Sequence, residues 1–94
     1  MPPPDLTRHA QAGMRQRGIS GEVLDCLLEF GAVCHDHRGG EVLYFDKRAR
    51  ERCRAALAEP DYRRLEGRFN VYAVRASDGA LVTVGHRLRR VPRS

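Results

Sequence analysis

The chain has 94 residues, 41% of them hydrophobic, and its seventeen basic and twelve acidic side chains leave a net charge of +5. That length suits one domain over residues 1–94, with loose ends at 1–4 and 91–94, where proline occurs and little can be buried. No stretch approaches the roughly 18 apolar residues of a membrane helix, and Met1–Asp5 lacks the basic and apolar regions of a signal peptide. We therefore expect a cytoplasmic protein with no membrane partner.

The cysteines are Cys26, Cys34 and Cys53, an odd number with no C-x-x-C pair. This pattern argues against a disulfide framework. Cys26 and Cys53 fall on the apolar faces of expected helices, and Cys34 falls on the apolar face of an expected strand. We therefore expect small, buried thiols.

The basic residues are unevenly distributed. Only Lys47 is a lysine, and codon bias explains that preference for arginine but not the excess of positive charge. No acidic residue follows Asp78. The basic residues gather in two clusters along the chain. Two basic clusters on a small domain are typical of a protein that binds a polyanion such as RNA, although a solvated charged face is the alternative for either cluster alone. The clusters are Lys47, Arg48, Arg50, Arg52 and Arg54, and Arg87, Arg89, Arg90 and Arg93.

Two helices are expected before residue 32. Asp5 or Thr7 can cap the first helix, which ends at Gly18. Ser20 is a good N-cap for the second helix, which ends at Gly31. Apolar residues at helical spacing support both helices: Leu6, Ala10 and Met14 in the first, and Val23, Leu24, Leu27 and Leu28 in the second.

The first pair of strands is expected over 32–37 and 41–46. The pair Gly39-Gly40 between them signals a tight hairpin. With these glycines as the two loop residues, His35 pairs with Tyr44. Because side chains alternate between the faces of a sheet, four residues then share the face away from the core: His35, His37, Val42 and Tyr44.

A third helix is expected over 47–58, with its arginines pointing outward. Pro60 stops this helix, and residues 61–65 form one more helical turn before Gly67. The residues expected to face inward are Ala49, Cys53, Ala56 and Leu57.

The second pair of strands is expected over 69–76 and 80–88. Asp78-Gly79 between them is the strongest short hairpin signal in the chain. With that loop, Ala73 pairs with Val84, and the core face carries Phe69, Val71, Ala73, Val82, Val84 and Leu88, with Arg75 opposite Val82. The other face carries Asn70 beside Arg87, Tyr72 beside Gly85, and Val74 beside Thr83.

The expected order is α-α-β-β-α-β-β, an α+β domain. Two N-terminal helices and a third helix pack on one face of a four-stranded antiparallel sheet. The other face then presents tyrosines, an arginine, an asparagine and two histidines, an unusual set for a merely solvated surface.

The segment His35-Asp36-His37 allows two interpretations. A structural zinc site needs four ligands, and no second cluster such as C-x-x-C exists, so no metal and no cofactor are expected. The alternative is RNA cleavage by a general acid and base, with arginine holding the phosphate. Each histidine and tyrosine is equally compatible with a structural role. The candidate catalytic residues are His35, His37, Tyr44, Tyr72 and Arg87, and the candidate RNA-binding residues are His9, Arg17, Arg48, Arg52, Asn70, Arg89 and Arg90.

The segment Leu6–Ser20 resembles the opening motif of the DUF4258 family of small bacterial proteins, roughly H-A-x-x-R-M-x-x-R-G-I-S. Leu81–Arg87 is similar to that family's terminal strand, with His86 in place of a common tyrosine. Gly13 departs from the motif because the family usually has arginine there. The matching residues of the opening motif are His9, Ala10, Met14, Arg17, Gly18, Ile19 and Ser20.

The resemblance implies a layout like that of the BrnT and RelE/ParE-like toxins, whose characterised ribonucleases cut RNA without metal. The first hypothesis is therefore a metal-independent endoribonuclease of the toxin–antitoxin type, with RNA or the ribosome and an antitoxin as partners. The second is a non-catalytic RNA- or ribosome-binding module, which Gly13 favours because a cation is missing. The third is a protein-interaction or metal-binding domain.

Overall fold

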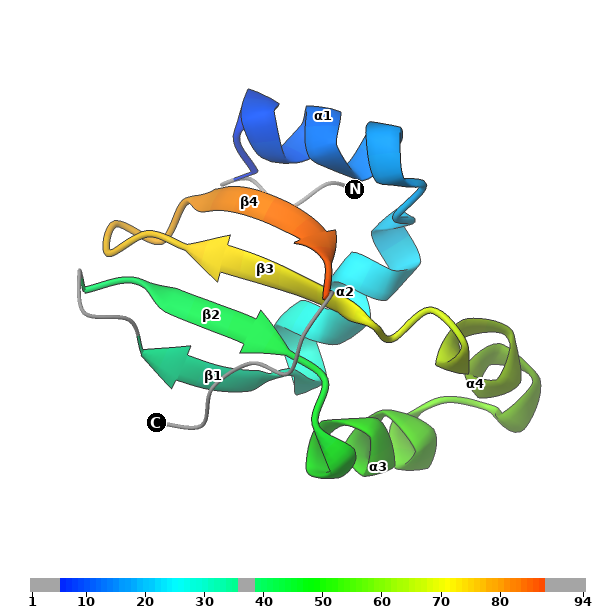
Figure 1. Ribbon diagram of the computed structural model, residues 1–94. Helices are drawn as coiled ribbons and strands as arrows, with labels where there is room; N and C mark the ends of the chain where they lie inside the picture. The colour runs from blue at the N-terminus through cyan, green and yellow to red at the C-terminus, as the bar shows by residue number, and fades with distance from the viewer. Residues whose placement is uncertain (1–5, 36–38, 88–94) are drawn as a thin grey trace.

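The computed structural model describes residues 6–35 and 39–87 (Figure 1). The chain forms an α+β fold, as the sequence predicts, with one helix more than expected. None of the helices in these two stretches is long and apolar enough to cross a membrane. In chain order the elements are α1 (Arg8–Arg17), α2 (Gly21–Phe30), β1 (Ala32–His35), β2 (Glu41–Tyr44), α3 (Lys47–Ala56), α4 (Glu59–Glu66), β3 (Val71–Arg75) and β4 (Leu81–His86).

The first two helices begin and end where the sequence predicts. The Thr7 hydroxyl accepts a hydrogen bond from the backbone N–H of Ala10 at 3.2 Å, and Gly18 closes α1 with a φ of 66°, a left-handed conformation that favours glycine. The Ser20 hydroxyl accepts from the N–H of Val23 at 3.3 Å and so caps α2.

The additional helix is α4, where the sequence predicts a single turn. Pro60 lies in its first turn, where a proline removes no intrahelical hydrogen bond. Pro60 therefore helps to start a new helix. The preceding helix, α3, ends at Ala56, two residues before its predicted end.

The sheet has the strand order β1-β2-β3-β4, with every neighbouring pair antiparallel. In Figure 1, α2 lies behind the strands, α1 runs alongside β4, and α3 and α4 lie beyond the end where β2 finishes. None of the described helices covers the front of the sheet. The helices thus occupy one face, one edge and one end, whereas the prediction placed three on a single face.

The second hairpin has the predicted register over most of its length. Ala73 pairs with Val84, as expected. A bulge near the loop pairs Arg75 with Leu81, so the expected pairing with Val82 is wrong. The bulge also places Leu81 in the core, 2% exposed, where Val82 was expected.

The first hairpin has a different register from the predicted one. His35 pairs with Glu41, and the expected pair with Tyr44 is wrong. Five positions separate these two paired residues, so the strands are not joined by the two glycines alone. Because the register differs by an odd number of residues, the β1 side chains lie on the opposite face from the predicted one.

The core fills the space between the sheet and the helices. It contains the aromatic pair Phe45 and Phe69, whose rings stack with centroids 4.3 Å apart. Cys26 and Cys53 are buried free thiols, as predicted, and Cys34 is only half-buried. Burial raises the pKa of the Cys53 thiol to about 12 and also raises that of Cys26, so both stay protonated at neutral pH.

Candidate nucleic-acid interface

The face of the sheet that no described helix covers is here called the open sheet face. Leu43, Ala73 and Val84 are buried on the helix side, so the alternate residues of each strand point to the other side. No acidic side chain occurs among these alternate residues. The open sheet face consists of Ala32, Cys34, Val42, Tyr44, Tyr72, Val74, Thr83 and Gly85.

Two tyrosines lie side by side at the centre of this face. Tyr44 of β2 is the direct cross-strand neighbour of Tyr72 of β3, and both are half-buried. The Tyr72 ring extends over Gly85 of β4, since a Cβ at that position would lie 3.1 Å from the Tyr72 Cε1 and 3.3 Å from its hydroxyl oxygen. Glycine leaves room for the ring here, because a Cβ would require the ring to shift by a few tenths of an ångström.

Arg87 adds a fixed positive charge to the tyrosine pair. Its guanidinium carbon lies 5.3 Å from the centroid of the Tyr44 ring, within the range of a cation–π interaction. Its Nη1 donates to the carbonyl of Phe45 at 3.1 Å, and its backbone N–H donates to the carbonyl of Asn70 at 2.7 Å. Its Nε is buried and has no hydrogen-bond partner among the described residues. Tyr44, Tyr72 and Arg87 thus form one cluster.

His35 does not belong to this cluster. It pairs with Glu41, which alternates with Tyr44 along β2, so His35 lies on the helix side of the sheet. Its Nδ1 is 3.8 Å from a Glu41 carboxylate oxygen, and that carboxylate also binds Arg75 at 2.7 Å. The prediction that His35 and Tyr44 share a face is therefore wrong. His37, the second expected acid or base, lies outside the described residues.

The residues predicted on α1 are likewise separate from the open sheet face. His9 and Arg17 are exposed, and the Arg17 Nη1 donates to the carbonyl of Gly13 at 3.5 Å. Gly13 itself is buried, and a Cβ there would lie 3.0 Å from the Val84 carbonyl oxygen. Glycine at this position allows α1 to approach β4 closely, because a Cβ would require the helix and the strand to separate by a few tenths of an ångström.

The remaining predicted RNA-binding residues lie at different places on the molecule. Arg52 donates to the carbonyl of Phe30 at 2.8 Å and so caps the end of α2. Arg48 is exposed in the first turn of α3, and Asn70 is exposed just before β3. Of these three, only Asn70 is hydrogen-bonded to the cluster, through its backbone carbonyl, which accepts from the Arg87 N–H. Arg89 and Arg90 lie outside the described residues.

His86 has a structural contact that the sequence did not indicate. Its Nε2 lies 2.9 Å from the carbonyl oxygen of Arg17, the last residue of α1. A carbonyl can only accept, so Nε2 carries the proton, and Nδ1 is buried with no partner among the described residues. His86 therefore holds the end of α1 against β4, on the helix side of the sheet.

The site is thus a flat aromatic surface beside a fixed arginine. Within residues 6–35 and 39–87, no three histidine, cysteine or acidic side chains are grouped so that they could hold a metal ion. A second region that contains a tyrosine is the groove of Tyr62 between α3 and α4. The sequence did not single it out, because its residues are distributed over two helices and the link between them.

Comparison with known proteins leaves the family open. No protein-family model, no curated protein and no solved structure matches the chain. The resemblance to the DUF4258 family, and the toxin activity, ribosome and antitoxin expected from it, therefore remain predictions.

Proposed function

We propose that the protein binds single-stranded RNA through the open sheet face, without cleaving it. The observation that carries this proposal is the cross-strand pair of Tyr44 and Tyr72 with the Arg87 guanidinium against the first ring. Unpaired bases stack on aromatic side chains, and each stacked base contributes about 1–3 kcal/mol. Two adjacent rings can accept two successive bases.

The charges around the tyrosine pair suit a phosphate backbone. Arg87 is positive, and the strand residues that form the open sheet face include no carboxylate. The net charge of +5 also favours association with a polyanion. An unpaired strand fits this surface better than a duplex does, because the bases of a duplex are stacked on one another and cannot reach the rings.

The arrangement of the histidines is the reason for proposing binding without cleavage. Attack by a 2′-hydroxyl needs a base within hydrogen-bond reach of it and an acid near the leaving oxygen. His35 lies on the other side of the sheet, and His86 is directed towards α1. The described part of the open sheet face carries hydroxyls, one thiol and one guanidinium, but no histidine and no carboxylate to act as a general base.

The test is the binding of a fluorescent uridine oligomer, followed by anisotropy between about 50 and 200 mM salt. We expect affinity to fall steeply with salt, and to fall by about tenfold for Tyr44→Leu or Tyr72→Leu. Tyr62→Leu is the matched control, since Tyr62 lies outside the open sheet face. An affinity that is independent of salt, or unchanged in both open-face variants, would contradict the proposal.

Cleavage is measured in the same samples by gel electrophoresis of the probe, with a chelator present. We expect the oligomer to remain intact. Cutting that is lost in Tyr44→Leu would show that the surface is catalytic and would overturn the non-catalytic part of the proposal.

A further inference from the structure

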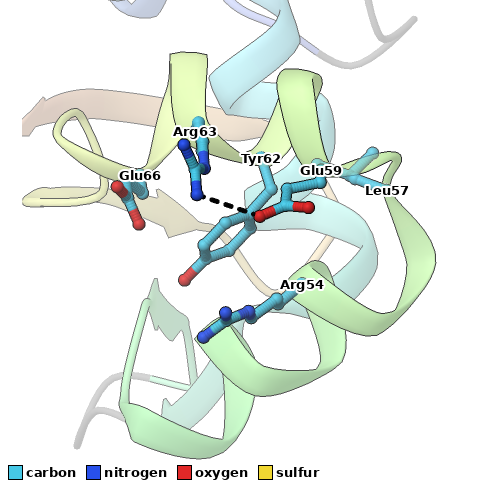
Figure 2. A pocket seen from close by; sticks show the side chains of 6 residues that line it. All are labelled: Arg54, Leu57, Glu59, Tyr62, Arg63 and Glu66. Atoms are coloured by element: carbon cyan, nitrogen blue, oxygen red, sulfur yellow. Dashed lines mark ion pairs between the residues drawn. The ribbon is translucent and has the colours of Figure 1, made fainter.

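A groove between α3 and α4 has the size of a small-molecule site. Its volume is about 490 Å³, within the range of typical ligand pockets. Figure 2 shows Tyr62 at its centre, with Arg54 of α3 on one side of the ring and Glu59, Arg63 and Glu66 of α4 on the other. The six lining residues are Arg54, Leu57, Glu59, Tyr62, Arg63 and Glu66.

Tyr62 presents a fixed aromatic surface to this groove. Its ring meets Phe69 edge to face, with centroids 5.9 Å apart, and Phe69 in turn stacks on Phe45 in the core. The ring is half-buried, and its hydroxyl points out from between the helices (Figure 2). A planar ligand can therefore lie against a ring that the core already holds in place.

The charged residues of the groove divide into a paired set and an unpaired set. Glu59 and Arg63 form an ion pair at 3.1 Å, one turn apart on α4. Arg54 lies with its guanidinium carbon 5.7 Å from the centroid of the Tyr62 ring. Within the part of the chain that the structure describes, neither Arg54 nor Glu66 forms an ion pair. The groove thus offers an aromatic ring, one guanidinium and one carboxylate.

These three groups define the chemistry of a complementary ligand. The ring suits a planar base, the guanidinium suits a phosphate, and the carboxylate accepts two hydrogen bonds from adjacent donors. Guanine has a ring N–H beside an exocyclic amino group. Adenine and cytosine place an acceptor beside their amino group, and uracil places carbonyls beside its N–H, so each would direct an acceptor at the carboxylate.

We propose that the groove between α3 and α4 binds a guanine nucleotide. The base lies against Tyr62, Glu66 accepts from the ring N–H and the exocyclic amine, and Arg54 binds the phosphate. The nucleotide is either free or a guanosine within an RNA chain. This site is separate from the open sheet face, so either proposal can fail without the other.

The first experiment measures binding of the four nucleoside monophosphates to the intact protein by calorimetry. We expect the guanine nucleotide to bind about tenfold or more tightly than the other three, the discrimination typical of a good bidentate contact to a base. Inosine monophosphate, which lacks the exocyclic amine, should bind less tightly than the guanine nucleotide. Equal affinity for all four nucleotides, or no binding at millimolar concentration, would overturn the proposal.

Two variants assign the roles within the groove. Glu66→Gln should abolish the preference for guanine, because an amide cannot accept both hydrogen bonds. Arg54→Gln should weaken binding of the monophosphate while leaving binding of guanosine, which has no phosphate, unchanged. Tyr44→Leu is the matched control on the open sheet face and should bind the guanine nucleotide like the wild type. A preference that survives Glu66→Gln would contradict the assignment.

A third measurement separates the two sources of the nucleotide. A uridine oligomer with one terminal guanosine is compared with the all-uridine oligomer. If the guanosine increases the affinity, and Glu66→Gln removes that increase, the groove recognises guanosine within RNA. If the monophosphate binds and the terminal guanosine adds nothing, the ligand is the free nucleotide; both results support a guanine site.

Discussion

Two regions of this molecule contain the same pair of side chains, a tyrosine ring with a guanidinium against it. Arg87 lies 5.3 Å from the Tyr44 ring on the open sheet face, and Arg54 lies 5.7 Å from the Tyr62 ring in the groove between α3 and α4. The first pair has another tyrosine beside it and no carboxylate on its face, whereas the second has Glu59 and Glu66. The surroundings of the pair, and not the pair itself, therefore determine the ligand we propose for each region.

The largest effect is expected when both rings of the open sheet face are removed. The double variant Tyr44→Leu/Tyr72→Leu should weaken binding of a uridine oligomer by about a hundredfold, since each stacked base contributes about 1–3 kcal/mol. Its affinity for the guanine nucleotide should not change. Anisotropy and calorimetry check the two halves of this prediction, and an equal loss of both ligands would show that the two regions are not independent.

Replacement of Gly85 should affect the open sheet face through its packing. Gly85→Ala places a Cβ 3.1 Å from the Tyr72 ring, so the ring must move, at a cost of about 1–3 kcal/mol in the free energy of unfolding and a loss of RNA affinity. Gly67→Ala is the matched control, because no atom lies within 4 Å of the added Cβ and its φ is −72°. Urea unfolding measures the stability of both. If Gly85→Ala is as stable as Gly67→Ala, the ring does not require the glycine.

Gly13→Ala tests whether glycine allows α1 to approach β4. Alanine normally stabilises a helix by about 1 kcal/mol relative to glycine, but here the new Cβ lies 3.0 Å from the backbone oxygen of Val84. We expect net destabilisation of about 1 kcal/mol. Gly21→Ala in the first turn of α2 has open space and should be neutral or stabilising. RNA affinity should not change in either variant, since α1 lies outside the open sheet face.

The smallest expected effect is the change that a bound ligand causes in the rate at which the cysteines are alkylated. Burial raises the pKa of the Cys53 thiol to about 12 and also raises that of Cys26, so neither should react with iodoacetamide at pH 8 while the protein is folded. Cys34 lies on the open sheet face and should react, more slowly when a uridine oligomer is bound. The guanine nucleotide should give no such protection. Peptide mass spectrometry follows all three sites, and protection by the nucleotide alone would reverse the assignment of ligands.

The fold was predictable from the sequence wherever a local signal determined the structure. Thr7, Ser20 and Gly18 fixed the ends of two helices through caps that involve only neighbouring residues. Asp78-Gly79 fixed most of the second hairpin, because Gly79, with a φ of 92°, and the Asp78 carboxylate, which accepts from Ala80, form the turn by themselves. These features need no information from the rest of the chain.

The first hairpin was not predictable in this way because distant contacts determine its register. Glu41 binds Arg75 of β3 and lies opposite His35, and Leu43 pairs with Ala73. These tertiary pairings favour the observed register over the one that a two-glycine turn would give. As a result, the sequence placed the tyrosines and Arg87 correctly but put His35 on the wrong face, which changes the inferred chemistry from cleavage to binding.

The central claim is that RNA lies across Tyr44 and Tyr72. The most direct test is photocrosslinking of a uridine oligomer that carries 4-thiouridine, with the crosslinked residues mapped by mass spectrometry. We predict crosslinks at Tyr44, Tyr72 or their neighbours on the open sheet face. Crosslinks confined to α1, or to the groove of Tyr62, would contradict this account of the molecule.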